Sequence, residues 1–321
     1  MGNRNMHLNQ NKKVVVVGSI NCDIAAYVDE FPTPAQTVLA RRSNITLGGK
    51  GLNQAMASLR AGSDISLIGC IGKDNFGSMA LEFLTENDIK TEHIKVIQGT
   101  ETGVANILVS SRGQNMIAVC PGANANLTPK DVLTAEEQII GSEVLLTQME
   151  VPVESVKSAL TVAAENQIKS IFNPAPALEV AKELFSIAYL ITPNEVEVES
   201  FTGILPQCYE SASEAAIALR QLGAQSIIIT MGDKGCFVSE NGRNEMIPAY
   251  SVEPLDSTGA GDVFNGVLAS CLAKSEDLFS AARTASAAAA ISVTRHSAQG
   301  ASPTEAEIKD FIGHHHNRIA I

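Results

Sequence analysis

The sequence predicts a three-layer α/β/α fold with a mostly parallel central sheet, to which a small β-sheet is attached as a lid. The chain opens on a β-branched run, residues 14–17, that is typical of a buried central strand. From residue 128 onward, helical segments alternate with short β-branched segments, which predicts βαβ units and a parallel sheet. Two β-rich insertions, at about 23–47 and 101–120, fall outside this alternation and predict the lid.

Length and composition indicate one sizeable globular unit. The chain has 321 residues, of which 45% are hydrophobic, and we expect a single domain over residues 13–312 after a flexible polar tail at 1–12. The tail lacks the apolar stretch of a signal peptide, and no apolar run approaches the roughly 18 residues of a membrane span. The net charge of −12 argues against nucleic acid or an anionic membrane as a partner. Six scattered cysteines without a C-x-x-C pair indicate a reducing, cytoplasmic location.

The individual elements are expected from their hydrophobic periods. Before residue 128 they comprise strands at 14–17 and 65–72, a helix at 75–86, and a hairpin with strands at 102–109 and 116–120. The alternating part comprises helices at 131–140, 153–166, 178–185 and 211–222, and strands at 143–146, 170–172, 189–191 and 226–230. The last part comprises a hairpin at 237–247, a helix reaching Lys274, an alanine-rich helix at 279–293, and a solvated tail with His314-His315-His316.

The most informative stretch is Asp256-Ser257-Thr258-Gly259-Ala260-Gly261-Asp262, which leads into the helix that reaches Lys274. The first N–H groups of a helix lack internal partners, and the helix dipole there favours a negative charge. Gly259, Ala260 and Gly261 are therefore a candidate cradle for a phosphate or a charged transition state. Asp262 is either a general base that takes a proton from an attacking hydroxyl, or an ordinary acid stabilised at a helix start.

A second glycine-rich stretch, Gly48-Gly49-Lys50-Gly51, also runs into a helical segment. It does not match the G-x-x-x-x-G-K-[ST] pattern of a Walker A loop. Lys50 and Asn53 could donate hydrogen bonds to hydroxyls or a phosphate, although a glycine-rich turn with a surface lysine has the same pattern.

Polar side chains follow several of the expected strands at the point where each strand ends. The carboxyl ends of parallel strands share one edge of a sheet, where ligands bind in open α/β folds. Turn chemistry alone explains such residues equally well. The segments concerned are Asn21 to Asp23, Gln148 to Glu150, Asn173 to Ala177, Thr192 to Glu195, and Thr230 to Gly235.

The chain resembles the PfkB-type sugar kinases over about residues 13–312. The resemblance rests on three motifs in this order: the glycine-rich stretch at 48–51 with Asn53, the segments at 173–177 and 192–195, and the stretch at 256–262. The residues from Ser19 to Asp23, the run from Gly49 to Gln54, and Glu150 make the resemblance strongest to members that phosphorylate ribose. The resemblance implies Asp262 as catalytic base and Gly259, Ala260 and Gly261 as anion hole. It implies sugar-contacting roles for the positions that match Asn21, Asp23, Gly49, Lys50, Asn53, Glu150 and Asp262.

For the nucleotide and cations, the resemblance implies ATP with Mg²⁺ near Asn194, Glu197, Thr230, Gly232, Gly235 and Gly261. It further implies an activating K⁺ held by Asp256 and Thr258, with a C-terminal segment that contains Val293, His296, Ala298 and Ser302. The implied reaction phosphorylates O5 of D-ribose, and the implied assembly is a homodimer through the β lid.

Three other functions remain open at this stage. The first is a kinase of the same fold for another sugar or nucleoside, such as deoxyribose, fructose or adenosine. Asn21 favours a full ribose over a deoxy sugar, and few aromatic residues are available to stack a nucleobase. The second is a non-catalytic sugar-binding regulator, which would be expected to lack Asp262 or the glycines. The third is an NAD-binding Rossmann protein, against which the missing G-x-G-x-x-G argues.

Overall fold

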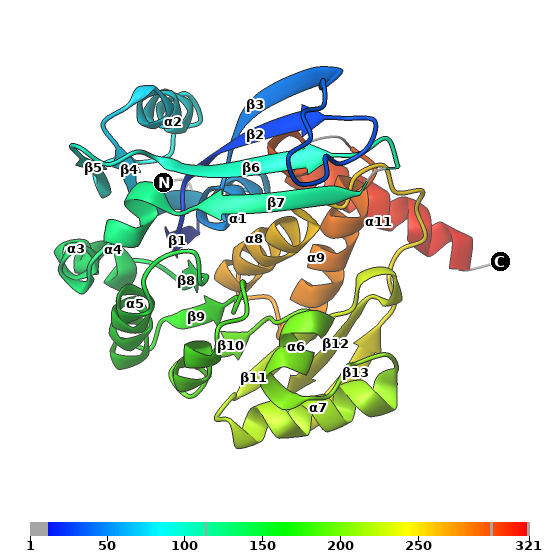
Figure 1. Ribbon diagram of the computed structural model, residues 1–321. Helices are drawn as coiled ribbons and strands as arrows, with labels where there is room; N and C mark the ends of the chain where they lie inside the picture. The colour runs from blue at the N-terminus through cyan, green and yellow to red at the C-terminus, as the bar shows by residue number, and fades with distance from the viewer. Residues whose placement is uncertain (1–11, 113, 296–297, 320–321) are drawn as a thin grey trace, which may run out of the picture.

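A computed structural model of the protein describes residues 12–112, 114–295 and 298–319, so the expected tail at 1–12 lies outside the described residues apart from Lys12. Two sheets organise the chain (Figure 1). Helices cover both faces of the large sheet, and the small sheet lies outside this three-layer body. The predicted three-layer α/β/α fold with an additional small sheet is confirmed.

The large sheet, as far as the chain is described, has nine strands in the order β13-β12-β11-β10-β9-β8-β1-β4-β5. All neighbours are parallel except around β12, which runs antiparallel to both β11 and β13. The strands are Lys13–Val17 (β1), Asp64–Gly72 (β4), Ile94–Ile97 (β5), Val144–Thr147 (β8), Lys169–Phe172 (β9), Leu190–Ile191 (β10), Ser226–Thr230 (β11), Cys236–Glu240 (β12) and Arg243–Ile247 (β13).

Each face of the large sheet carries its own hydrophobic core. In β1, Val14 and Val16 pack into one core while Val15 and Val17 pack into the other, as the period of two in a strand requires. The first core is covered by α1 (Lys50–Arg60), α2 (Asn75–Glu86), α8 (Ala260–Ala273), α9 (Leu278–Ser292) and α11 (Glu305–Ile319). The second is covered by α3 (Pro129–Thr134), α4 (Glu136–Ile140), α5 (Val153–Glu165), α6 (Glu195–Thr202) and α7 (Tyr209–Gln221).

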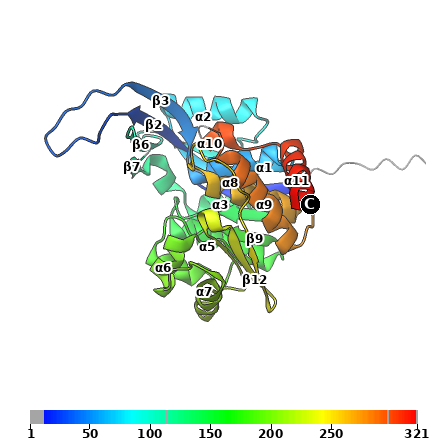
Figure 2. The ribbon, with the colours of Figure 1, turned by 90° about the vertical axis from the view of Figure 1, so that its right-hand side faces the viewer.

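The small sheet has the strand order β3-β2-β6-β7 and joins the two expected insertions. Its strands are Asn21–Tyr27 (β2), Arg42–Gly48 (β3), Gly103–Val109 (β6) and Asn115–Cys120 (β7). The pair β2 and β6 is parallel, whereas the other two pairs are antiparallel. Figure 2 shows that the loop between β2 and β3 extends far from the body of the molecule. The role of this sheet as a lid and the domain limits 13–312 stay predictions.

Several elements differ from the sequence-based expectation. The helix expected at 131–140 is two helices, because Ala135 leaves helical geometry (φ −101°, ψ 14°). The helix expected at 178–185 is a 3₁₀ helix, Glu179–Leu184 (η2), whose buried residues Ala181 and Leu184 follow three-residue spacing. The edge strand β5 and the helix α6 were not expected. His314 and His315 lie in α11, and His315 packs against Phe311 rather than in a solvated tail.

Helices α1 and α8 pack closely, and this contact positions the functional edge described below. Ser58 Oγ donates a hydrogen bond to the Gly266 carbonyl over 2.8 Å, which joins the two helices across the interface. A Cβ atom on Gly266 would lie 2.5 Å from both the Ala57 Cβ and the Gln54 carbonyl oxygen. The close approach of α1 and α8 therefore requires glycine at position 266. No helix among the described residues is both long and apolar enough to cross a membrane.

We expect Gly266→Ala to lower the free energy of unfolding by about 1–3 kcal/mol, because overpacking forces the two helices apart. Chemical denaturation followed by circular dichroism measures this change. Gly313→Ala is the matched control, since a Cβ on this helical glycine of α11 meets nothing within 4 Å. The control should be neutral or slightly stabilising, as alanine favours a helix. Equal effects of the two substitutions would contradict the close-packing argument.

Candidate active site

The carboxyl ends of the parallel strands and the start of α8 border a cleft of about 960 Å³. This is the edge of the sheet at which the sequence predicted ligand binding. The cleft brings together most of the predicted nucleotide residues with the predicted base and anion hole. The predicted residues that line it are Lys50, Asn194, Glu197, Thr230, Gly232, Gly235, Gly259, Ala260, Gly261, Asp262 and Val293.

The start of α8 has the geometry of an anion cradle. Gly259 precedes the helix in the left-handed region, at φ 78°, where glycine is favoured. A Cβ on Gly261 would meet nothing within 4 Å, so there is open space above the first turn of the helix. The free N–H groups and the dipole of this 14-residue helix favour a negatively charged group in that space.

Asp262 sits in the first turn of α8 and is only 8% exposed. Two side-chain amides from α1 hold its carboxylate: Asn53 Nδ2 donates to Oδ2 over 3.1 Å, and Gln54 Nε2 donates to Oδ1 over 3.0 Å. These donors fix the plane of the carboxylate. Asp262 also lines the cleft, so a hydrogen-bond acceptor is presented to a bound ligand. The structure thus places Asn53 and Asp262, two residues expected at the site, within hydrogen-bond distance.

A network of buried amides continues from Asp262 to the strand ends. Gln54 Nε2 also donates to Asn173 Oδ1 over 3.2 Å, and Gln54 Oε1 accepts from Gln148 Nε2 over 2.6 Å. Asn173 Nδ2 donates to the Thr192 carbonyl over 3.0 Å. Because these residues follow β8, β9 and β10, the network ties three strand ends to α1 and α8.

A second branch of the network returns to the anion cradle. Thr192 Oγ1 donates to Asn265 Oδ1 over 2.6 Å, and Asn265 Nδ2 donates to the Gly261 carbonyl over 2.9 Å. Asn265 is 2% exposed and lies one helical turn after Asp262. The strand end at Thr192 therefore supports the first turn of α8.

Glu150 binds the start of α1, on the side away from the nucleotide residues. Its Oε2 accepts hydrogen bonds from Ser19 Oγ over 2.6 Å and from the Lys50 backbone N–H over 3.1 Å. Ser19 Oγ in turn accepts from the Gly51 N–H over 3.3 Å. A carboxylate at a helix N-terminus is electrostatically favourable. Gly49 is the N-cap residue of this helix, with φ 87°.

Asn21 and Asp23 lie in β2, a strand of the small sheet, rather than in a turn after β1. Asn21 is 3% exposed, and its Oδ1 accepts from Asn124 Nδ2 over 2.7 Å. Asn124 also bonds both the N–H and the carbonyl of Ile20, at 2.9 and 3.1 Å. With its oxygen occupied, the Asn21 amide offers N–H donors to a ligand. The structure thus brings Asn21 and Asp23 to the root of the small sheet, near the start of α1.

Four acids and one lysine interact electrostatically across this region. Burial raises the pKa of Asp23 to about 6, and the nearby charges of Glu150 and Asp262 act in the same direction. For Lys50, burial works to lower the pKa, but the charges of Asp262, Glu150 and Glu197 outweigh it, so the pKa lies above its usual value. Burial likewise raises the pKa of Glu197. Lys50 therefore stays charged where it lines the cleft.

Asn194 and Glu197 form a capping box at the start of α6. The Asn194 N–H donates to Glu197 Oε2 over 2.8 Å, and the Glu197 N–H donates to Asn194 Oδ1 over 2.9 Å. Both residues line the cleft. Amide and carboxylate oxygens suit Mg²⁺, which keeps several waters and binds chiefly through phosphates and one or two carboxylates. The residues present therefore fit the implied divalent cation.

The predicted potassium residues partly meet in one loop. The carbonyl of Val293 accepts from the N–H groups of Leu255 and Asp256 over 2.7 and 3.1 Å, and Asp256 Oδ1 accepts from the Thr258 N–H over 2.9 Å. Ser302 is buried and follows α10 (Ala298–Ala301). A carboxylate and backbone carbonyls are the oxygen ligands that a hard cation prefers. His296 lies outside the described residues.

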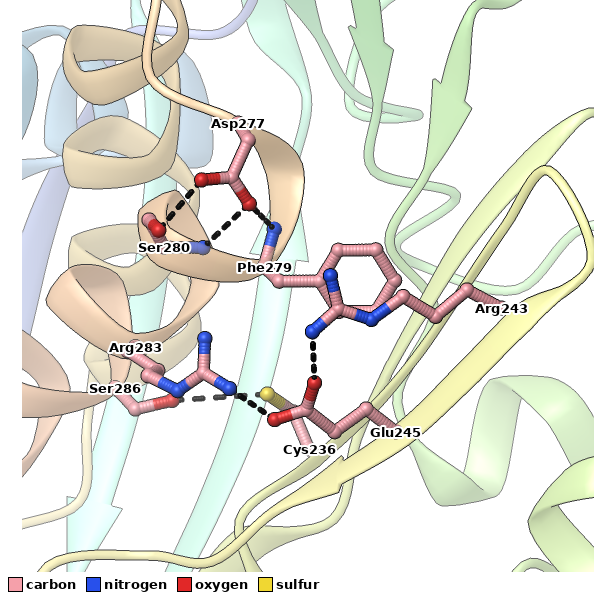
Figure 3. A network of polar contacts seen from close by, with 8 residues as sticks. All are labelled: Cys236, Arg243, Glu245, Asp277, Phe279, Ser280, Arg283 and Ser286. Carbon is pink, nitrogen blue, oxygen red and sulfur yellow. Dashed lines mark hydrogen bonds and ion pairs between the residues drawn. The ribbon is translucent and has the colours of Figure 1, made fainter.

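A network of polar contacts joins the hairpin of β12 and β13 to helix α9 (Figure 3). Glu245 forms ion pairs with Arg243, over 2.7 Å, and with Arg283, and the Arg243 guanidinium lies 3.7 Å from the centre of the Phe279 ring. Behind this pair, Cys236 Sγ contacts Ser286 Oγ at 3.6 Å. Ser286, Ala289 and Ala290 of α9 line the cleft, so the network holds that helix face in place.

Sequence reasoning missed several polar residues of the site: Ser19, Gln54, Asn124, Gln148, Thr192 and Asn265 were assigned no role of their own. Each is buried and bonded to a predicted site residue or to its partner. Asn265 could have been found from its position three residues after Asp262, on the same face of an otherwise apolar helix. Gln54 follows Asn53 directly, but nothing local pairs it with residue 262.

An anion cradle at a helix start, a buried acid beside it and a lysine on the same cleft are the groups that a phosphoryl-transfer enzyme requires. The family model for pfkB carbohydrate kinases matches residues 11–305. The chain therefore belongs to the pfkB carbohydrate kinase family, and it is a sugar kinase that transfers phosphate to an alcohol group.

Individual relatives agree with this assignment. The chain is 39% identical over 303 residues to a ribokinase of Haemophilus influenzae, covering 94% of this chain and 99% of the relative. It is 32% identical over 300 residues to a deoxyribokinase of Salmonella typhi, covering 93% and 98%. Among solved structures it resembles ribokinase from Thermotoga maritima, with a TM-score of 0.83, 33% identity and coverage of 94% and 99%. It also resembles ribokinase from Cryptococcus neoformans in complex with ADP, with a TM-score of 0.82, 28% identity and coverage of 94% and 99%.

The partly buried carboxyl of Asp23 predicts a pH-dependent stability. Because its pKa of about 6 in the folded protein lies above the ordinary value of 3.8, its contribution to the free energy of unfolding is full below about pH 4 and is lost as the pH rises through 6. Asp23→Asn mimics the protonated form at every pH. We expect the variant to gain about 2 kcal/mol of stability relative to the wild type between pH 4 and pH 7.

Urea denaturation at several pH values measures this difference. Asp88→Asn removes an exposed carboxylate and is the matched control for loss of a charge. A stability difference between Asp23→Asn and wild type that stays constant from pH 4 to pH 7 would contradict the raised pKa.

Proposed function

We propose that the chain is an ATP-dependent ribokinase that converts D-ribose to D-ribose 5-phosphate. The observation that carries the proposal is the buried carboxylate of Asp262, held by Asn53 and Gln54 at the start of α8 and open to the cleft. The similarity to ribokinases over nearly the whole chain supports ribose as the acceptor. The ADP complex of the similar Cryptococcus protein supports an adenine nucleotide as the donor.

In the proposed mechanism, Asp262 is the general base that accepts the proton of the ribose O5 hydroxyl as that oxygen attacks the γ-phosphorus. The bond between the γ-phosphorus and the β,γ-bridging oxygen breaks, and ADP leaves with the electron pair of that bond. Its two amide donors keep it oriented while the proton moves to it. The N–H groups at Gly259, Ala260 and Gly261 bind the transferred phosphoryl group and stabilise charge that develops on its oxygens. Lys50, charged and on the same cleft, adds a positive field on the sugar side.

Asn21, Asp23, Gly49, Lys50, Asn53 and Glu150 are proposed to bind the sugar hydroxyls. Several short polar groups with fixed donor and acceptor roles select against a sugar that lacks a hydroxyl, because its partner would be left without a hydrogen bond. The Asn21 amide, whose oxygen is occupied by Asn124, supplies a donor of this kind.

The nucleotide is proposed to occupy the cleft along Asn194, Glu197, Thr230, Gly232 and Gly235. Mg²⁺, when bound with the nucleotide, would neutralise phosphate charge, and Asn194 and Glu197 are the residues proposed to hold its water shell. Asp256, Thr258, Val293, Ala298 and Ser302, together with His296, are the proposed segment for K⁺, whose binding would stabilise the loop that precedes the anion cradle.

A homodimer through the small sheet is proposed from its exposed apolar surface. Every residue of the edge strand β7 is exposed, and Met116, Ile117 and Val119 are 56%, 52% and 47% accessible. An edge strand with such side chains favours association with another protein surface. The acidic net charge supports the view that nucleic acid is no partner, and location in the cytoplasm and the lack of a membrane partner stay predictions from composition.

The sugar assignment is tested by coupled ADP release over a panel of ribose, deoxyribose, fructose and adenosine, with and without K⁺. We expect kcat/KM to be highest for ribose, by about 100-fold over deoxyribose, because the deoxy sugar leaves a buried donor without a partner. Replacing K⁺ by a large organic cation should lower kcat. Good turnover of another sugar without turnover of ribose would remove the ribose assignment.

The role of Asp262 is tested with Asp262→Ala. We expect kcat to fall by about 100-fold or more, because general-base catalysis is lost. Ribose binding measured by calorimetry should change by only a few fold. Glu253→Ala, which removes an exposed acid from the loop leading to α8, is the matched control. A near-normal kcat in Asp262→Ala would exclude the base role.

A further inference from the structure

The Gln54 side chain is held in one orientation by its surroundings. It is fully buried, and all of its polar groups are engaged: Nε2 donates to Asp262 Oδ1 and to Asn173 Oδ1, while Oε1 accepts from Gln148 Nε2. Turning the amide over would place its oxygen against two acceptors and its N–H groups against a donor. The hydrogen bonds therefore define the orientation uniquely.

Gln148 fixes this orientation without touching Asp262. It follows β8 and is fully buried, and its Nε2 donates to Gln54 Oε1 over 2.6 Å. Its own Oε1 has no hydrogen-bond partner among the described residues. A buried oxygen without a hydrogen-bond partner lowers the stability of the fold. The Gln148 amide therefore has a cost that an apolar side chain of similar size would not have, and the structure retains it together with the hydrogen bond to Gln54.

We propose that Gln54 and Gln148 form a relay that positions Asp262 for proton abstraction, with Gln148 acting through Gln54. This inference rests on the proposed function, in which Asp262 is the base. No proton passes along the two amides. Gln148 sets which end of the Gln54 amide faces Asp262, and the N–H of Gln54 then fixes the Oδ1 edge of the carboxylate.

The first test compares single and double substitutions. We expect Gln54→Leu to lower kcat by about 10- to 100-fold and Gln148→Leu by about 5- to 10-fold, with KM for ribose and for ATP within about 3-fold. The double variant should be no slower than Gln54→Leu, because residue 148 acts only through residue 54. Effects that multiply, or that appear in KM, would overturn the relay.

The second test reads the orientation of Gln54 through the pH profile of kcat. In Gln148→Glu a carboxylate replaces the donor, so the Gln54 amide turns over and presents its oxygen to Asp262. An acceptor facing the carboxylate disfavours its ionised form. We expect the acid limb of the profile to move by about one unit to higher pH. The same substitution in a Gln54→Leu background should produce no such shift, which separates the relay from a direct effect of the added charge.

Other charged groups face Asp262, and they are unchanged in all of these variants: Lys50 from α1, Asp23 from β2 and Glu197 from α6.

Thr147→Val is the matched control, since it removes a neighbouring buried oxygen that has no partner in the described structure. It should leave kcat and the acid limb unchanged. An unmoved acid limb in Gln148→Glu would overturn the relay even if Gln54→Leu fails to fold. Absence of any kinase activity in the wild type would instead refute the proposed function.

Discussion

A buried carboxylate without amide donors would be unstable in its ionised form, and this constraint shapes the centre of the molecule. Asp262 lies in the first turn of α8, where an anion is also meant to bind, so its charge needs compensation from another element. Helix α1 supplies that compensation through Asn53 and Gln54. The close packing of α1 on Gly266 then follows as a requirement, because a wider separation would break both hydrogen bonds.

The same network explains why the fold places its functional residues on one edge. The side chains after β8, β9 and β10 are amides and a hydroxyl that bond to each other and to α1 and α8, rather than separately to water. Such a chain of hydrogen bonds restricts side-chain motion, and a rigid acceptor and cradle need little reorganisation when charge develops. The parallel sheet sets the distance between neighbouring strand ends, and the hydrogen bonds between the amides fix the side chains at those ends.

Local patterns in the sequence were sufficient to predict the three layers, the glycine-rich start of α8 and a candidate base. They also placed Lys50 and Asn53 together, because these residues share one helix start. The bond between Gln54 and Asp262 joins residues 208 positions apart, and that between Asn124 and Asn21 joins residues 103 apart, so no local period reveals them. The strand β5 has only four residues and one buried side chain, which is too short for a clear alternation. Helix α6 carried a readable capping box that was overlooked.

The hydrogen bonds of Asn124 have a mechanical consequence. They clamp the backbone on both sides of Ile20 and the side chain of Asn21 to the segment that returns from β7. The start of β2 and the segment after β7 are therefore joined by hydrogen bonds, which fix the base of the small sheet. A movement of its outer strands relative to the body would therefore have to bend β2 beyond Asn21 and leave Asn21 itself in place.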